Sequence, residues 1–152
     1  MKVKLEPKRI TLYWAGPLFT QAERIWNRLC AEYLRKKGYN VVLPQDEAKK
    51  FKGDCDGIAK HCFEQTVSSD LFVAVLDGAD TDSGTSLEAG IRIKSDRLSI
   101  GVRTDFRASE DGQLNAMFRL FDTIIYFPSF DESYEKLCDQ IDRTIRNYLT
   151  MY

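Results

Sequence analysis

The stretch Leu71–Gly90, LFVAVLDGADTDSGTSLEAG, decides the fold. Its apolar opening, Leu71–Leu76, predicts a strand that is buried on both faces. An acidic turn with glycine follows, and then a helix whose first turns carry one carboxylate, Glu88. The hydroxyls that we expect to cap this helix belong to Ser83, Thr85 and Ser86. Glu88 is thereby placed just beyond the carboxyl end of a central strand, where open α/β sheets bind their ligands.

Glu88 is the candidate catalytic residue of this stretch. Near the amino end of a helix, the helix dipole favours an ionised carboxylate, and Asp82 lies six residues earlier in the turn. An ionised glutamate beside a second carboxyl group that can carry a proton is the equipment of a retaining glycosyl transfer. The structural alternative is that Glu88 is an ordinary first-turn helix residue and that Asp82–Thr85 is a solvated loop.

Strands and helices alternate through the rest of the chain. The other predicted strands are Ile10–Trp14, Val41–Leu43, Leu98–Val102 and Thr123–Phe127. The predicted helices are Gln21–Lys37, Gly57–Ser69, Leu87–Lys94, a short one through Met117 and Leu120, and Glu132–Tyr148. The lysine-rich segment Gln45–Asp56 and the charged segment Thr104–Gly112 are predicted to be loops, the first a candidate lid. This alternation predicts a single α/β domain over residues 1–152, with a five-stranded parallel sheet flanked by helices on both faces, like a flavodoxin or Rossmann half.

Charge and hydropathy narrow the classes of partner. The 152 residues carry a formal net charge of -1 at pH 7, and no basic block or basic-aromatic stripe is present. We therefore expect no nucleic-acid polymer and no anionic membrane as partner, which leaves small ligands. No apolar run is long enough to span a bilayer, and no signal peptide is evident, so a cytoplasmic location is expected.

The sequence also predicts no metal and no cofactor. The four cysteines, Cys30, Cys55, Cys62 and Cys138, lack paired CxxC spacing, which favours reduced core residues over a disulfide frame or zinc site. His61 is the only histidine, which argues against a metal site and against a His-based triad. No GxGxxG follows the first strand, and no GxxxxGK[ST] is present, so nothing supports a dinucleotide or phosphate-loop cofactor site.

Three motifs carry a resemblance to a known family. They are the run Tyr13–Phe19 (YWAGPLF), the pattern Asp82–Gly90 (DSGTSLEAG) and the tripeptide Asn115–Met117 (NAM). In order and spacing these motifs resemble nucleoside 2-deoxyribosyltransferases, over nearly the whole chain. The same superfamily also contains nucleotide N-glycosidases.

The resemblance implies a covalent mechanism. Glu88 would attack the anomeric carbon of a 2'-deoxynucleoside, expel the base and form a deoxyribosyl ester, which a second free nucleobase then attacks with net retention of configuration. The leaving base needs a proton, and Asp82 matches the acidic position that contacts it. Tyr13 matches the position whose hydroxyl orients the nucleophile. The bland alternatives are that Asp82 only caps the helix and that Tyr13 only packs at a strand end.

The resemblance also implies a set of substrate-binding residues, namely Gly16, Phe19, Gln45, Gly84, Asn115 and Met117. Gly16 would let the backbone approach the ligand, Phe19 would lie against the base unless it is core, and Gln45 would recognise the base unless it faces solvent. Asn115 and Met117 match residues that reach into the site of a neighbouring subunit. That match implies a homodimer or a larger homo-oligomer.

One departure from the family pattern matters. Transferases of this family carry Asp or Asn eight residues before Asp70, where this chain has Cys62. A thiol is a poor donor to a base, so either protonation shifts toward Asp82 or the substrate range differs.

Three functions stay open: a transferase, an N-glycosidase of nucleosides or nucleotides, and a non-catalytic nucleotide-binding module. The bulky, uncharged turn Gly16–Phe19 favours nucleosides over 5'-monophosphates.

Overall fold

The computed structural model describes residues 10–107 and 114–151. Its five strands are β1 (Thr11–Ala15), β2 (Asn40–Val42), β3 (Leu71–Val75), β4 (Ser99–Arg103) and β5 (Thr123–Tyr126). They form one parallel sheet in the order β2-β1-β3-β4-β5. The long helices are α1 (Gln21–Lys36), α3 (Cys55–Ser68), α4 (Ser83–Ile93) and α5 (Tyr134–Met151). Three short ones are α2 (Pro44–Glu47), η1 (Ala48–Phe51) and η2 (Ala116–Leu120). The predicted α/β class, five parallel strands and two helical layers are confirmed.

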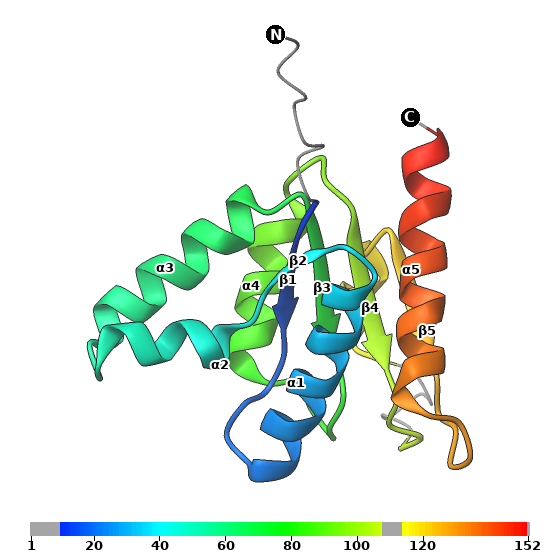
Figure 1. Ribbon diagram of the computed structural model, residues 1–152, viewed down its shortest axis with the longest axis horizontal. Helices are drawn as coiled ribbons and strands as arrows, with labels where there is room; N and C mark the ends of the chain where they lie inside the picture. The colour runs from blue at the N-terminus through cyan, green and yellow to red at the C-terminus, as the bar shows by residue number, and fades with distance from the viewer. Residues whose placement is uncertain (1–9, 108–113, 152) are drawn as a thin grey trace, which may run out of the picture.

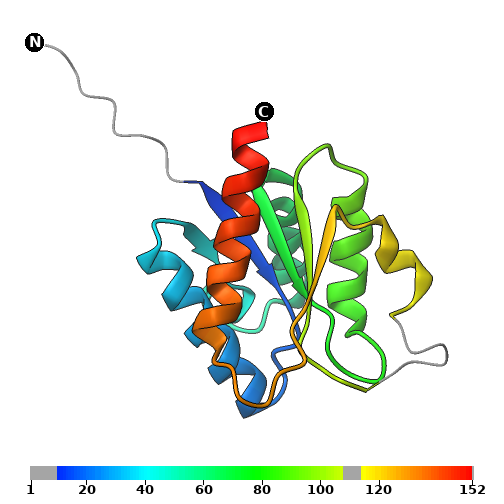
Figure 2. The same cartoon turned by 90° about the vertical axis from the view of Figure 1, so that its right-hand side faces the viewer.

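The sheet separates two cores, and α1 and α5 cover one face while α3 and α4 cover the other (Figures 1 and 2). Alternate residues of a strand point to opposite faces. In β1, Leu12 and Trp14 belong to the core under α1 and α5, whereas Tyr13 and Ala15 belong to the core under α3 and α4. The side chain of Tyr13 is thereby directed toward the helix that bears Glu88.

A buried arginine fixes α4 against its neighbours. Arg92 is fully buried, and its guanidinium donates hydrogen bonds at 2.8–3.2 Å to the carbonyl oxygens of Thr66, Ser69, Asp70 and Leu98. These carbonyls belong to the carboxyl end of α3 and to the residues that come just before β3 and β4. Burial lowers the pKa of Arg92 to about 10, which still leaves it charged at neutral pH. Because Arg92 lies one turn beyond Glu88, this clamp also sets where Glu88 sits over the sheet.

The prediction of an irregular loop at Gln45–Asp56 is wrong. Pro44 stands at the first position of α2, where its fixed φ suits a helix start and its missing N–H costs nothing. Lys49 and Lys50 pair with the carboxylates three residues earlier, at 3.2 and 2.7 Å. Glu47 also lies 3.0 Å from the His61 ring of α3. The segment proposed as a lid is therefore helical and held to α3.

Other sequence-based boundaries agree within a few residues. Of the predicted loop Thr104–Gly112, residues 104–107 are irregular and the remainder lies outside the described residues. The assignment of residues 1–152 to one domain stays a prediction. None of the helices within residues 10–107 and 114–151 is both long and apolar enough to cross a membrane.

Candidate active site

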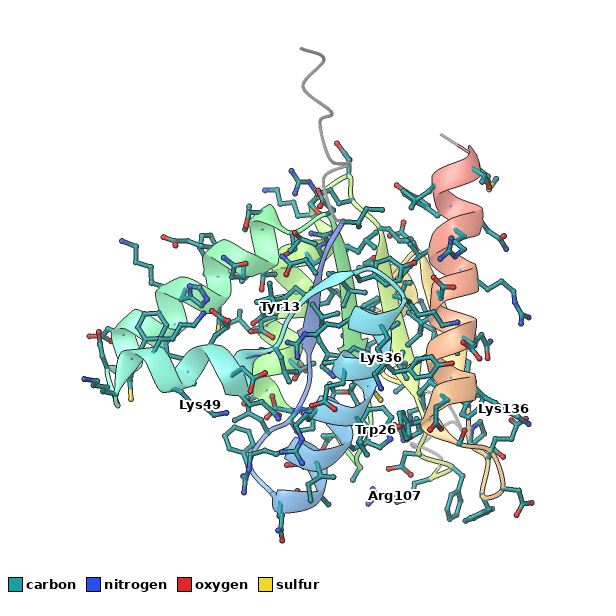
Figure 3. All side chains as sticks on the ribbon, viewed as in Figure 1. Tyr13, Trp26, Lys36, Lys49, Arg107 and Lys136 are labelled. Carbon is teal, nitrogen blue, oxygen red and sulfur yellow. The ribbon has the colours of Figure 1, made fainter. Side chains whose placement is uncertain are left out.

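A tyrosine of β1 and a glutamate of α4 form the centre of the candidate site. The Tyr13 hydroxyl donates a hydrogen bond to Glu88 Oε1 at 2.7 Å. The Tyr13 ring stacks on Phe72, its partner in the β1–β3 register, with centroids 5.9 Å apart and planes 15° apart. Two neighbouring strands thus hold the hydroxyl in place beneath α4, and Figure 3 labels Tyr13 on the ribbon of β1. The pairing expected between Tyr13 and Glu88 is present.

The Glu88 carboxyl is difficult to ionise. Burial raises its pKa to about 7, and the negative charge of Asp82 adds to the increase, while the Tyr13 hydrogen bond opposes it. The prediction that the helix dipole would keep Glu88 ionised is therefore wrong in its net effect. Glu88 is the sixth residue of α4, beyond the first turn in which the dipole acts strongly, so desolvation prevails. At neutral pH the carboxyl group is divided between its two protonation states.

Asp82 is the N-cap of α4. Its Oδ2 accepts hydrogen bonds from the Thr85 N–H at 2.9 Å and the Thr85 hydroxyl at 3.0 Å. The prediction that hydroxyls cap this helix is wrong, because an ionised carboxylate binds the free N–H groups more strongly than a hydroxyl. The Ser86 hydroxyl instead donates to the Asp82 carbonyl at 3.0 Å. Asp82 is thus a helix cap and also an electrostatic neighbour of Glu88.

Cys62 joins this cluster from α3. Its thiol is near enough to Tyr13 for each group to affect the pKa of the other. Burial raises the pKa of Cys62, and the negative charges of Glu88 and Glu47 raise it further, so the thiol is protonated at neutral pH. Burial and the charge of Glu88 also lift the pKa of Tyr13 far above its usual range. The hydroxyl of Tyr13 therefore keeps its proton and remains a donor to Glu88.

The predicted base-binding residues are not all near this pair. A Cβ on Gly16 would lie 3.1 Å from Val75 Cγ2, so close packing of the turn on β3 also requires glycine there. Phe19 is 72% exposed. Gln45 faces α1, because its Nε2 donates to the Arg24 carbonyl at 2.8 Å and its Oε1 accepts from Asn27 at 3.4 Å. In its present orientation Gln45 is thus turned away from Glu88.

Asn115 and Met117 also lie apart from the Tyr13–Glu88 pair, whereas Gly84 stands one turn before Glu88 on the same face of α4. A Cβ on Gly84 would lie 3.3 Å from Asp82 Oδ2, so this glycine leaves room for the helix cap. Asn115 caps η2 by accepting from the Met117 N–H at 3.0 Å. Asn115 and Met117 line a cavity of about 390 Å³ against α4.

The cavity beside η2 faces away from Glu88. Its α4 wall includes Ser86 and Gly90, which stand two residues before and after Glu88. Two residues correspond to about 200° of rotation around an α-helix. Within one chain, Asn115 and Met117 are therefore on the opposite side of α4 from Glu88.

Two neighbours of the site are missing from the sequence-based set. Phe72 supports Tyr13, and the available signal was an aromatic residue at the matching position of the adjacent predicted strand. Cys62 stood out only as a departure from a family pattern, and its position near Tyr13 depends on how α3 crosses β1. Among residues 10–107 and 114–151, no three His, Cys, Asp or Glu side chains are grouped so that they could hold a metal ion.

Comparisons with known proteins concern the family and the fold. Residues 12–121 match the family model "Nucleoside 2-deoxyribosyltransferase", and no curated protein sequence matches. A conserved protein from Enterococcus faecalis V583 is similar in structure, at 26% identity and a TM-score of 0.70, over 90% of this chain and 99% of that one.

Two further solved structures share the fold. The 2-desoxiribosyltransferase from Leishmania mexicana is 21% identical, with a TM-score of 0.63 over 86% of this chain and 97% of its own. A CMP N-glycosidase from Clostridium botulinum is 16% identical, with a TM-score of 0.61 over 87% and 98%. Because the family model spans well over half of its residues, the chain belongs to the nucleoside 2-deoxyribosyltransferase family.

Proposed function

We propose that this protein moves 2-deoxyribose between nucleobases, with Glu88 as the nucleophile. The observation that carries the proposal is the 2.7 Å hydrogen bond from Tyr13 to a carboxyl group whose pKa is about 7. A carboxylate with such a pKa is more basic, and hence a stronger nucleophile, than an ordinary glutamate, yet much of it is ionised at neutral pH. Tyr13 binds one oxygen of Glu88 and leaves the other for attack.

The reaction proceeds in two displacements at the same carbon. In the first, a Glu88 oxygen bonds to C1' of the deoxynucleoside, while the C1'–N bond breaks and its electron pair leaves with the base. In the second, a nitrogen of another base bonds to C1', the ester C–O bond breaks, and the Glu88 carboxylate is regenerated. The departing base takes up a proton and the incoming base loses one, so charge balances. Two inversions give net retention.

We assign proton exchange with the base to Asp82: its protonated carboxyl group passes a proton to the departing base and recovers one from the incoming base. Asp82 is near enough to Glu88 to affect its pKa, and it begins α4 at the carboxyl edge of the sheet. Cys62 keeps its proton too firmly, and a thiol donates too weakly, to take this role.

Exposed Phe19 would lie against the base, and Gln45 would reach the base only after releasing Arg24. Gly16 and Gly84 would leave room for the ligand beside these turns.

We further propose a homodimer or larger assembly in which Asn115 and Met117 serve the site of a partner subunit. The cavity beside η2 faces away from Glu88 of the same chain, which favours a role in another copy. On its wall, Met117 is 66% exposed and Leu120 is 57% exposed. Apolar side chains exposed together in this way are typical of a protein interface.

We keep the cytoplasmic location as part of the proposal. All four cysteines are free thiols, and a reducing compartment keeps thiols in that state.

Incubation with a deoxynucleoside, with and without a second free base, tests the activity. The proposal expects a new deoxynucleoside only when the acceptor base is present, identified by chromatography. Release of free deoxyribose that does not depend on acceptor would instead assign an N-glycosidase. Ligand binding without any turnover would assign a non-catalytic module.

Subunit mixing tests the shared site. Asn115→Ala and Glu88→Ala proteins are each expected to be impaired, and mixing them under exchange conditions should restore sites that take Glu88 from one chain and Asn115 from another. A mixture of Glu88→Ala with Glu88→Gln is the control and should stay inactive. A monomeric protein with full activity would contradict the shared site.

A further inference from the structure

A second cavity, of about 440 Å³, opens on the other face of the sheet. Its walls come from the ends of β1, β3 and β4 and from the first turns of α1. The lining residues that matter here are Pro17, Trp26, Val75, Asp77, Thr104 and Arg107. Val75 belongs to the core under α1 and α5, whereas Tyr13 belongs to the opposite core. In Figure 3, Trp26 and Arg107 lie close together and away from Tyr13. This cavity is therefore separate from the Tyr13–Glu88 pair.

The position of the cavity is one at which sheets of this kind bind ligands. The chain leaves β1 through α1 to reach β2 on one side, and leaves β3 through α4 to reach β4 on the other. The crevice between the carboxyl ends of β1 and β3 is thus the topological switch point of the sheet. The volume also falls within the roughly 300–1,000 Å³ of small-molecule pockets.

Trp26 gives the cavity an aromatic wall. Its ring is half-buried and packs against Trp14, with centroids 5.8 Å apart and planes 55° apart. The Trp14 N–H is bound to Asn27 Oδ1 at 3.1 Å, whereas the Trp26 N–H has no hydrogen bond within the part of the chain that the structure describes. The cavity therefore has an aromatic side chain on its wall, on which a flat ring can stack.

The charged groups around the cavity are mostly committed to the protein. Asp77 accepts from the N–H groups of Thr104 and Asp105. Arg107 uses Nε and Nη2 to bind the Asp105 carboxylate, and among residues 10–107 and 114–151 its Nη1 has no hydrogen-bond partner. With Glu23 and Asp77 both on the wall, an anionic ligand would meet two carboxylates and one guanidinium. The lining thus suits an uncharged ring with acceptor atoms on its edge.

We propose that this cavity binds a small, neutral, planar heteroaromatic molecule of the class of a free nucleobase, at a site distinct from that of Glu88. The ring stacks on Trp26, and an acceptor atom on its edge accepts from Arg107. The choice of a nucleobase among such rings rests on the proposed function, in which free bases are both substrate and product. The protein then holds a base at two places, one of which does no chemistry.

The experiment follows the two indole N–H signals of the wild-type chain by NMR during titration with adenine, hypoxanthine, cytosine or thymine alone. The chain has two tryptophans, and Trp26→Phe assigns the signals. We expect at least one base to shift the Trp26 signal saturably and more than the Trp14 signal. Arg107→Gln should weaken this binding roughly tenfold or more, as expected for a lost charged hydrogen bond. Lys136→Gln, a change at an exposed lysine on α5, should leave the binding unchanged.

Two outcomes would overturn the proposal: a Trp26 signal that no base moves, or a shift that Arg107→Gln and Lys136→Gln leave equally unchanged. Arg107 is largely exposed, and the Trp14 signal reports whether the variant is folded. The test is independent of turnover. If exchange activity is absent and the Trp26 signal still responds, only the proposed function fails. If exchange occurs and the signal does not respond, only the cavity proposal fails.

Discussion

The two faces of the sheet are built from the same strands but hold their polar groups in different ways. Under α1 and α5, polar groups are paired, as where the Tyr39 hydroxyl donates to Asp142 at 2.6 Å while Arg146 binds the same carboxylate at 3.0 Å. Under α3 and α4, Glu88 has a hydroxyl as its partner, with a second carboxylate, Asp82, nearby. The first arrangement stabilises an ionised acid, whereas the second destabilises one.

The two carboxyl groups therefore contribute to different properties of the protein: Asp142 to stability and Glu88 to chemistry. A carboxyl group whose folded pKa lies above its unfolded value disfavours folding whenever it must be ionised. Such a group persists where its basicity is useful. The Asp142 cluster under α1 and α5 thus stabilises the fold, whereas Glu88 under α3 and α4 costs stability and supplies the reactive group. The predictions below change one face at a time.

The largest expected effect is on activity. Glu88→Ala should lower exchange by more than about 10³-fold, a loss of roughly 4 kcal/mol of transition-state stabilisation, because the bond to C1' can no longer form. Glu64→Ala, at an exposed glutamate of α3, is the matched control and should keep full activity. Steady-state exchange rates of both variants and of wild type, measured on a deoxynucleoside with an acceptor base, test this prediction. Near-normal turnover of Glu88→Ala would remove the proposed nucleophile.

A second effect concerns stability and its pH dependence. The folded pKa of Glu88 is about 7 against an ordinary value of 4.5, so the folded state binds the proton more tightly. Stability should therefore fall as pH rises between these values. Glu88→Gln removes the penalty and should raise unfolding free energy at pH 8 by up to about 3 kcal/mol. At pH 4 the variant and wild type should differ little. Denaturant titrations at both pH values check this, and an equal gain at both would contradict it.

Tyr13→Phe should act on both rate and pH profile. Loss of a hydrogen bond to a charged group costs about 1.5–3 kcal/mol, which predicts a fall of roughly 10- to 100-fold in kcat/KM. The same bond lowers the pKa of Glu88, so its removal should move the acidic limb of the kcat/KM profile to higher pH. An unchanged limb would show that Tyr13 does not set the protonation of the nucleophile.

The opposite face should show the reverse pattern. Tyr39→Phe removes a buried hydrogen bond to Asp142, which keeps Arg146 as a partner. We expect a loss of about 1–2 kcal/mol of stability and exchange rates within about twofold of wild type. Thermal unfolding and rate assays on the same protein measure both. A large loss of activity without loss of stability would break the proposed division between the faces.

Local sequence features predicted most of the fold. The apolar run Leu71–Leu76 and the alternation around it depend on neighbouring residues only, so the sheet and its helical layers could be anticipated. Glu88 also stood out from its neighbouring residues alone, whereas Tyr13 was named only through the family resemblance. The short helices at Pro44–Phe51 were not predicted, because their polar residues show no helical repeat of apolar positions. These helices are held by contacts with α3 instead.

Features that depend on packing could not be read from the chain. The raised pKa of Glu88 comes from burial under α4, and the cap by Asp82 replaced the expected hydroxyl caps because helix α4 starts at Ser83. Gln45 turns toward α1 because Arg24 and Asn27 stand there. Each of these depends on a contact between segments far apart in sequence, or on the exact residue at which a helix begins.

Mass spectrometry of the protein quenched in acid after mixing with a deoxynucleoside alone tests the central claim most directly. Without an acceptor base the ester should accumulate, and peptide mapping should place one deoxyribosyl group on the peptide that contains Glu88. Glu88→Gln protein treated in the same way should carry none. A deoxyribosyl group mapped to any other residue, or active wild-type protein that never carries one, would contradict Glu88 as the nucleophile.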